Sequence, residues 1–254
     1  MLRRMRMYLS GLAFFAIFAL TFAPSAFASD QPVQLISANI YTYKYGYVAF
    51  SGSVEVSNLS YQKNVTIHYN PGDGHWYDTS ASYQGPTDSS HEKWNFEVST
   101  SSVNNTNPQL ANAQYIQFAI KYEVGGQTYW DNNNGQNYSV SRNNMSSTIL
   151  GKPNVLRASD YLYQNTFSGD VFVKNLDYTK TVKIVYTTDN WNTTKEGYAS
   201  YYQSVNADDS VQDWHFSFNN IDSSISQIKY AISYTVKGQT YWDNNYGNNY
   251  TVSR

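Results

Sequence analysis

Apolar and polar residues alternate with a period of two along most of the chain, starting after residue 29. The clearest alternating stretches lie at residues 54–56, 65–69, 94–98 and 116–122. Turn-forming residues separate these stretches, and no stretch after residue 29 has a convincing helical period. Short alternating segments joined by turns are typical of antiparallel strands packed as a sandwich. The pattern therefore predicts an all-β fold.

Two similar units follow each other along the chain. The octapeptide GQTYWDNN occurs at Gly126–Asn133 and again at Gly238–Asn245. Upstream of it, FSGSVEVSNLSYQKNVTIHY (Phe50–Tyr69) matches FSGDVFVKNLDYTKTVKIVY (Phe167–Tyr186). Each unit has about a hundred residues, which is the usual size of an independent domain. We therefore expect two tandem antiparallel β-sandwich domains.

The first 28 residues have the features of a secretory signal peptide. Arg3, Arg4 and Arg6 precede an apolar run that ends in the small-residue cleavage pattern Ala26-Phe27-Ala28. The alternative is a retained membrane anchor, but the run is short for a spanning helix and Pro24 interrupts its end. We therefore expect a secreted protein with no membrane association after the leader is cleaved.

The remaining chain divides at a stretch rich in Ser, Asn, Gly and Pro. The expected parts are a signal peptide at 1–28, a first module at 29–142, a linker at 143–152 and a second module at 153–254.

Composition narrows the class of ligand. The chain has 17 Lys+Arg and 19 Asp+Glu, and the leader contains three of the arginines, so a nucleic-acid partner is not expected. There is no cysteine, so each module depends on its core rather than on disulfides. Tyrosine is abundant, with 25 residues, and only 14% of residues are charged. Flat aromatic rings and amides suit a neutral polar ligand.

The three tryptophans of each unit have different surroundings. Trp94 and Trp214 share the phase of the apolar residues around them, which predicts that both point into the core. Trp76 and Trp191 lie in the polar loops PGDGHWYDT and TTDNWNTTK. An aromatic residue in such a loop either plugs the end of the sandwich or faces a ligand, and the polar surroundings favour the ligand.

Trp130 and Trp242 lead directly into the amide-rich loops DNNNGQN and DNNYGNN. Local pattern alone leaves a core position and a ligand-facing position open. The amides have two explanations, which are compatible with each other. Asn side chains can hydrogen-bond sugar hydroxyls, and Asn and Gly also suit a tight loop that needs left-handed backbone conformations.

Catalytic and metal chemistry find little support. A glycosidase needs two carboxylates across the scissile bond, whereas Asp131 and Asp243 are the one acid clearly shared between the units. The four histidines form no metal-binding or triad spacing. The amide loop also lacks the ligands of a calcium-binding loop, because Arg142 stands where a glutamate is needed. We expect a binding protein without a cofactor or a metal.

Each unit combines an FSG segment, a loop tryptophan, an inward Trp-x-Phe pair and the GQTYWDNN hairpin followed by Asn-Tyr. In this combination each unit resembles a carbohydrate-binding module of family 21, the starch-binding domain type found in some fungal glucoamylases. The resemblance covers nearly all of the mature chain, twice. It implies an immunoglobulin-like β-sandwich that binds α-1,4-glucan, such as starch, amylose, glycogen or cyclodextrin. The family also occurs in intracellular phosphatase-targeting subunits, a role that the leader argues against.

The resemblance also implies two sites per unit. The principal site carries over in the first unit to Asn58, Lys63, Trp76, Trp130, Asn132, Asn134 and Asn137. In the second unit it carries over to Asn175, Lys180, Trp191, Trp242, Asn244 and Asn249. The second site carries over to Tyr61 and Tyr83 in the first unit and to Tyr178 and Tyr201 in the second. The chain departs from the family pattern at Tyr246, which replaces an amide, and at His91 and Val211, which replace the third aromatic residue of the second site.

The sequence thus favours a secreted, monomeric, non-catalytic α-glucan-binding protein. One alternative is a surface or matrix protein with a structural or adhesive role. A less favoured alternative is a small glycoside-active enzyme.

Overall fold

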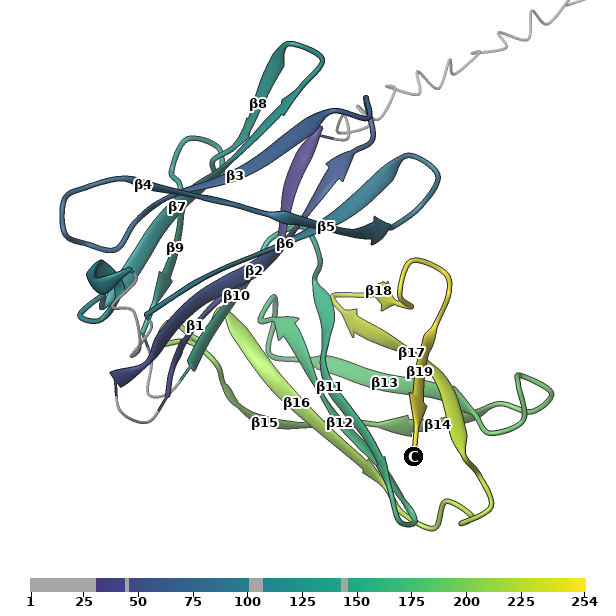
Figure 1. Cartoon of the computed structure of the whole chain (residues 1–254). Coiled ribbons are helices and arrows are strands. Elements are labelled where there is room, and N and C mark those ends of the chain that lie inside the picture. Colours follow the sequence, from purple (N-terminus) through teal and green to yellow (C-terminus); the bar gives the residue numbers. More distant parts are fainter. Residues whose placement is uncertain (1–30, 44–45, 101–106, 143–145) are drawn as a thin grey trace, which may run out of the picture. The chain divides into compact units, whose positions relative to one another are not determined.

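The computed structural model of the chain describes residues 31–43, 46–100, 107–142 and 146–254 (Figure 1). The predicted signal peptide lies outside these residues. Regular structure in the described part consists of strands and one short 3-10 helix, η2 (Pro108–Leu110). No helix in that part is both long and apolar enough to cross a membrane.

The first sandwich contains the strands β1 to β10. Their bounds are β1 (Val33–Thr42), β2 (Val48–Ser57), β3 (Lys63–Asn70), β4 (Tyr77–Ser80), β5 (Ser82–Pro86), β6 (His91–Ser99), β7 (Tyr115–Val124), β8 (Gln127–Asp131), β9 (Tyr138–Ser141) and β10 (Ser146–Leu150). One sheet has the order β10-β1-β2-β6-β5, and the other has the order β4-β3-β7-β8 with β9 also paired to β7. The four alternating stretches of the sequence lie in β2, β3, β6 and β7, so their prediction as strands is confirmed.

The second sandwich repeats this plan. Its strands are β11 (Val155–Tyr163), β12 (Thr166–Lys174), β13 (Lys180–Thr187), β14 (Lys195–Tyr198), β15 (Ser200–Ser204), β16 (Val211–Phe218), β17 (Gln227–Val236), β18 (Gln239–Asp243) and β19 (Tyr250–Ser253). The sheet orders are β11-β12-β16-β15 and β14-β13-β17-β18, with β19 also paired to β17. The chain thus folds as two tandem immunoglobulin-like antiparallel β-sandwiches, as the sequence predicts.

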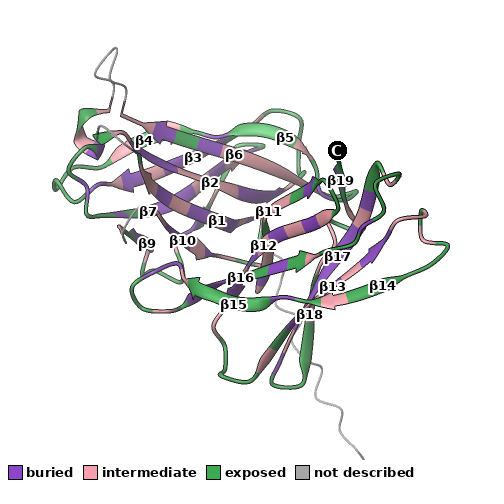
Figure 2. Cartoon of the chain, turned by 90° about the horizontal axis from the view of Figure 1, so that it is seen from below, coloured by how far each residue is buried: buried purple, intermediate pink, exposed green. Residues whose placement is uncertain are grey.

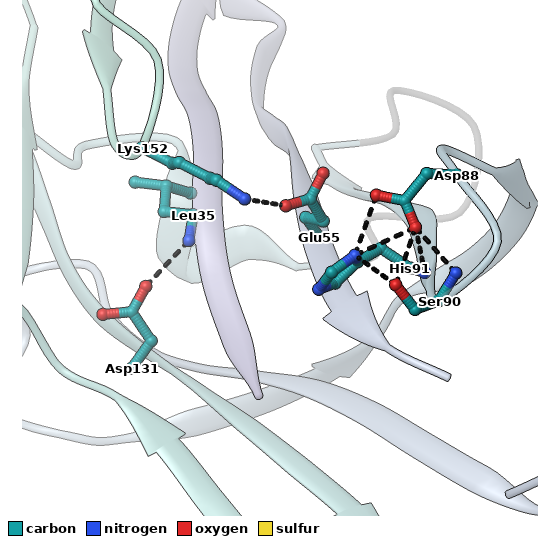
Figure 3. Close-up of polar contacts among 7 residues, drawn as sticks. All are labelled: Leu35, Glu55, Asp88, Ser90, His91, Asp131 and Lys152. Carbon is teal, nitrogen blue, oxygen red and sulfur yellow. Dashed lines mark hydrogen bonds and ion pairs between the residues drawn. The ribbon is translucent and has the colours of Figure 1, made fainter. Parts of the chain in front are cut away.

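Most of the predicted linker is part of the first sandwich. Residues 146–150 form β10, which pairs with β1 from Tyr41 opposite Ser146 to Ser37 opposite Leu150. The Lys152 amide donates to the Leu35 carbonyl oxygen, and its ammonium group pairs with the buried carboxylate of Glu55 (Figure 3). Because β10 continues the sheet beyond β1, it covers an edge that would otherwise expose backbone groups. The connection between the sandwiches is therefore the short segment after Leu150 and before Val155.

Each sandwich has its own core of buried side chains. Figure 2 shows buried positions alternating with less buried ones along several strands. In the first core, the Phe50 ring centroid lies 5.1 Å from that of Phe96 and 5.2 Å from that of Phe118. Trp94 and Trp214 are partly buried and pack against their cores, which confirms their predicted inward orientation.

A β-bulge interrupts the first strand of each sandwich. The bulges lie between Leu35 and Ser37 and between Arg157 and Ser159. Glycines face both of them: a Cβ atom on Gly52 would lie 2.3 Å from the Ser37 oxygen, and one on Gly169 would lie 2.4 Å from the Ser159 oxygen. Any other residue at these positions would push the bulged strand away, so glycine is required by the close approach.

An aspartate connects each bulge to the amide loop after β8 or β18. In the first sandwich, the buried Asp131 accepts a hydrogen bond from the Leu35 amide at 2.7 Å (Figure 3). It accepts another from the Tyr138 hydroxyl at 2.9 Å. In the second sandwich, Asp243 accepts from the Arg157 amide at 2.7 Å and from the Tyr250 hydroxyl at 2.6 Å. Burial raises the pKa of Asp243 in spite of these donors. The shared acid of the two units is thus engaged in holding the fold.

Replacement of Asp131 by alanine should destabilise the first sandwich by about 2–4 kcal/mol, because it leaves the Leu35 amide and the Tyr138 hydroxyl without their acceptor. Asp243→Ala should have a similar effect on the second sandwich. Thermal unfolding followed by circular dichroism measures both. Glu97→Ala, at an exposed position of β6, is the control and should leave the unfolding temperature unchanged. An unchanged temperature for Asp131→Ala would contradict the structural role.

Asp213 of β16 is a buried carboxylate without full hydrogen bonding. Its Oδ1 atom has no hydrogen-bond partner among the described residues. Burial, with a smaller contribution from the Asp170 carboxylate, raises the pKa of Asp213 to about 6. Since an unfolded aspartate has a pKa near 3.9, the folded state prefers the protonated form. The contribution of the Asp213 carboxyl to the free energy of unfolding is therefore fully present below about pH 4. This contribution is lost as the pH rises through about 6.

Asp213→Asn should consequently raise the free energy of unfolding at pH 7, by roughly 1–3 kcal/mol, because it removes the buried charge. The gain should shrink towards zero at about pH 4. Denaturant unfolding at the two pH values measures this difference. Asp208→Asn, at an exposed turn position, serves as the control. A loss of stability at pH 7 from Asp213→Asn would show that the charged form is needed.

Candidate functional site

In the first sandwich, Trp76 and Trp130 both contact His68 on the β4-β3-β7-β8 sheet. Trp76 lies in the loop between β3 and β4, and Trp130 lies in β8. His68 of β3 contacts both: its ring stacks on Trp76 with centroids 4.7 Å apart and planes at 8°, and meets Trp130 edge-on at 6.2 Å. The two tryptophans are 41% and 47% exposed. They therefore form an aromatic surface that faces solvent rather than the core.

The loop that carries Trp76 is fixed by an aspartate. Asp73 accepts hydrogen bonds from the His75 amide at 2.9 Å and from the Tyr77 hydroxyl at 2.7 Å. These two bonds, of which that from His75 contributes more, lower the pKa of Asp73. Asp73 therefore serves as an ionised support of the loop.

The corresponding loop of the second sandwich holds Trp191 in a strained backbone conformation. Asn190 and Trp191 have φ angles of 56° and 70°, a left-handed conformation that costs a bulky residue free energy. The Thr187 hydroxyl accepts from the Trp191 amide at 2.9 Å. Asp189 accepts from the amide and the hydroxyl of Thr193 at 2.8 and 2.7 Å, and hydrogen bonds from Thr193 and Thr187 lower the pKa of Asp189 to about 2. The surrounding hydrogen bonds thus hold the tryptophan in place.

A surface hollow of about 480 Å³ lies between the two tryptophans of this sandwich. Its lining consists of Trp191, Trp242, Val185, Ala231, Asn244 and Asn249. Two indole rings, a small apolar floor and two amides provide both flat apolar contact and hydrogen-bonding groups. Four of the six residues predicted for the principal site of the second unit are therefore brought together.

The amide loops confirm the backbone explanation of their composition. Asn133, Asn134 and Asn137 have φ angles between 51° and 57°, and Asn is among the few residues that adopt this region easily. The Asn132 side-chain oxygen accepts a hydrogen bond from the Gly135 amide at 2.9 Å, so this oxygen stabilises the loop itself. Asn244 makes the equivalent bond to Gly247 at 2.9 Å. In the second sandwich the loop places Asn244 and Asn249 in the same lining as Trp191 and Trp242.

Tyr246 takes the place in the second loop that Asn134 has in the first. Both residues have a φ angle of 56°, so the replacement leaves the path of the backbone unchanged. Tyr246 is 45% exposed, and it is absent from the lining of the hollow between the tryptophans. The amide lost at this position is therefore not replaced within the hollow.

Asn58 and Lys63 do not lie with these tryptophans. Lys63 begins β3, and His68 lies five residues further on, roughly 17 Å along the strand. Only 4% of the Lys63 side chain is exposed, and its ammonium group donates to Asn58 at 2.5 Å and to Glu92 at 2.9 Å. Their assignment to the principal site was wrong, because they lie at the opposite end of the strand. The same correction applies to Lys180 and Asn175, since Lys180 donates to Asn175 and to Gln212.

These residues instead adjoin the aromatic residues predicted for the second site. Glu92 also accepts from the Trp94 indole at 3.2 Å, and Trp94 meets Tyr83 edge-on at 5.9 Å. In the second sandwich Gln212, Trp214 and Tyr201 make equivalent contacts. Tyr61 and Tyr178, in the turns before β3 and β13, are 97% and 98% exposed. The lysine and its partners therefore support a second aromatic surface.

The third aromatic position of that surface is altered in both sandwiches. His91 is bonded to Asp88, with 2.9 Å between its Nδ1 atom and Asp88 Oδ2 (Figure 3). Val211 is only 3% exposed, so it lies beneath the surface. Neither side chain therefore extends the surface as an exposed aromatic ring would.

His68 and Val185 also belong to the tryptophan surfaces, although sequence reasoning did not select them. Each directly precedes an inward-facing tyrosine, Tyr69 or Tyr186, so period-two alternation places both on the outer face of the sheet. They also differ between units that otherwise match closely here. Position on the face and difference between the repeats were the signals that could have identified them.

Metal binding has no support in the described part of the chain, where no three His, Asp or Glu side chains are grouped so as to hold an ion. The acid shared by the units, Asp131 or Asp243, is engaged by backbone and tyrosine donors. The two aromatic surfaces provide flat rings for stacking and polar groups for hydrogen bonding.

Comparison with known proteins agrees with this chemistry. The family model of the carbohydrate/starch-binding module, family 21, matches residues 28–141 and 152–253. Glucoamylase 1 of Rhizopus oryzae is 35% identical over 136 residues, which cover 52% of this chain and 20% of that protein. Glycogen-binding subunit 76A of Drosophila melanogaster is 39% identical over 88 residues, which cover 34% of this chain and 12% of that protein. The chain thus matches only a small part of these relatives' length.

Among solved structures, the starch-binding domain of Rhizopus oryzae glucoamylase in complex with β-cyclodextrin and maltoheptaose is 33% identical. The match covers 41% of this chain and 95% of that chain, with a TM-score of 0.35. The family match covers most of the chain in two consecutive regions, one for each sandwich. The chain therefore belongs to the family of carbohydrate/starch-binding modules, family 21.

Proposed function

We propose that the protein is a secreted, monomeric, non-catalytic protein that binds α-glucan through the tryptophan surface of each sandwich. The observation that carries this proposal is the pair of indole rings beside an amide loop, repeated in both sandwiches. Trp76, Trp130 and Trp242 are between 41% and 55% exposed. Large aromatic side chains exposed together on a small domain are a common mark of a binding site.

The chemistry of the surface suits a neutral sugar. The C–H face of a glucosyl unit is flat and apolar, so it can cover an indole ring, while its hydroxyls need hydrogen-bonding partners. In the second sandwich, Asn244 and Asn249 line the same hollow as Trp191 and Trp242. Apolar contact and amide groups therefore lie within reach of one sugar.

The family and its members support the choice of sugar. The matching family model describes a starch-binding module, and one relative is a glycogen-binding subunit. Starch and glycogen are both built from α-linked glucose. We therefore assign starch-like or glycogen-like α-glucan as the ligand of this chain.

The second aromatic surface provides a further contact with the same polymer. Tyr61 and Tyr83 are 97% and 52% exposed, whereas the Lys63 side chain is almost fully buried. In this arrangement the tyrosines contact the sugar, and Lys63 positions the turn through Asn58 and Glu92. The leader at residues 1–28 is the basis for proposing secretion.

Trp76→Ala and Trp191→Ala should each weaken binding of β-cyclodextrin at their own sandwich by about thirtyfold, because truncation of a central aromatic anchor costs ~2 kcal/mol or more. Isothermal titration calorimetry on the full mature chain measures the loss. Unfolding temperatures should change little, since neither side chain belongs to a core.

Tyr163→Ala is the control, because it removes an exposed ring from β11, which lies in the sheet of the second sandwich opposite to the one that carries Trp191 and Trp242. It should bind normally. Normal binding by the Trp76→Ala/Trp191→Ala double variant would place the ligand elsewhere. A chain that binds no α-glucan at all would favour a structural or adhesive role, and release of reducing sugar from starch would favour an enzyme.

The tandem arrangement should increase affinity for polymers but not for short sugars. A short connection keeps the second sandwich near the polymer once the first has bound, at an effective concentration on the order of millimolar. Trp76→Ala or Trp191→Ala alone should therefore lower affinity for granular starch by roughly tenfold or more. The intact sandwich of each variant should retain its affinity for β-cyclodextrin. An equal affinity of single variants and native chain for granules would contradict avidity.

A further inference from the structure

The two tryptophan surfaces differ at one central position. His68 and Val185 occupy equivalent places: each faces an alanine on one neighbouring strand and an acid on the other. The facing pairs are His68 with Ala119 and Asp78, and Val185 with Ala231 and Glu196. The backbone around the position is therefore matched, and the side chain is what distinguishes the two surfaces.

In the first sandwich the imidazole ring covers one face of Trp76. The rings are nearly parallel, with centroids 4.7 Å apart, which leaves no room for a sugar between them. Asp78 fixes the ring, because its Oδ1 atom lies 2.7 Å from His68 Nδ1. The same ring meets Trp130 edge-on, with 6.2 Å between centroids. His68 thus fills the space between the two indoles.

In the second sandwich the same space is open. Val185 is short and lacks a ring, and it forms part of the lining of the hollow of about 480 Å³ between Trp191 and Trp242. Glu196, opposite Val185, does not take the place of the missing ring, because its carboxylate pairs with Lys183 at 3.0 Å. Both indoles therefore border an accessible hollow.

Building on the proposed function, we infer that His68 and Val185 determine how each sandwich contacts α-glucan. The second sandwich admits a glucosyl unit between Trp191 and Trp242, so it binds short linear malto-oligosaccharides well. The first sandwich offers the outer face of Trp76 and the exposed part of Trp130, so it needs a ligand that spreads over a surface, such as cyclodextrin or a polymer. A sugar held between two rings buries more apolar area than a sugar lying on one.

The test exchanges the two residues in the full mature chain. Tyr61→Ala and Tyr178→Ala are present throughout, so that the tyrosine surfaces do not contribute. The first tryptophan surface is measured with Trp191→Ala and Trp242→Ala added, and the second with Trp76→Ala and Trp130→Ala added. Calorimetry with maltotriose and with β-cyclodextrin gives the affinity ratio for the two sugars at each surface.

The second surface should favour maltotriose, relative to β-cyclodextrin, about five- to tenfold more than the first does, because a glucosyl unit in its hollow borders both indoles. His68→Val should move the ratio of the first surface towards that of the second, and Val185→His should do the reverse. His68→Phe keeps a ring at this position, although without the bond to Asp78, and should therefore shift the ratio of the first surface less than His68→Val does. Circular dichroism and thermal unfolding verify that each variant is folded.

The control exchange is Asn64→Thr with Thr181→Asn, an equivalent pair on the same faces of β3 and β13 but nearer the strand ends that lie away from the loop tryptophans. It should leave both ratios unchanged. If His68→Val and Val185→His also leave them unchanged while the surfaces bind glucan, the inference is overturned and the proposed function stands. If only one surface binds glucan, the inference is judged at that surface. It is overturned if the substitution there, His68→Val or Val185→His, leaves the affinity ratio unchanged. If neither surface binds either sugar, both are overturned.

Discussion

The carboxylates of Asp131 and Asp243 make the interaction on which each sandwich depends. Each accepts hydrogen bonds from a bulged first strand and from a tyrosine that begins β9 or β19. A carboxylate removed from water in this way is tolerated only when it is hydrogen-bonded. Since the amide loop begins directly after this aspartate, the same hydrogen bonds that close the sandwich also fix where that loop lies.

The two ends of β3 and β13 have different tasks because of this arrangement. At one end, the aspartate-anchored loop and the tryptophans form an open aromatic surface. At the other end, a lysine connects Asn58 to Glu92 in the first sandwich, and Asn175 to Gln212 in the second. Lys63 is thus a support whose contribution is to hold a turn, even though its charge would suggest contact with ligand.

The strands, the repeat and the inward tryptophans could be predicted because period-two alternation and internal similarity are local properties of the sequence. The strand β10 was not predicted. Gly151 and Pro153 beside it are typical of turns, and Ser146–Leu150 pairs with β1, which is distant in the sequence. The place of Lys63 was also missed, since spacing along a strand does not reveal which end faces a given loop. His68 belongs to no motif; alternation places it on the outer face of the sheet, but its contacts with Trp76 and Trp130 come from the structure.

The left-handed backbone of Trp191 has a consequence for how this protein can change. With a φ of 70°, that position would be occupied at lower cost by glycine or asparagine. In the first sandwich, Gly72 and Gly74 take the left-handed conformations instead, with φ of 89° and 84°. Selection for thermal stability alone would therefore replace Trp191 of the second sandwich before Trp76 of the first. Retention of Trp191 over many generations would itself be a record of selection for what the ring contacts.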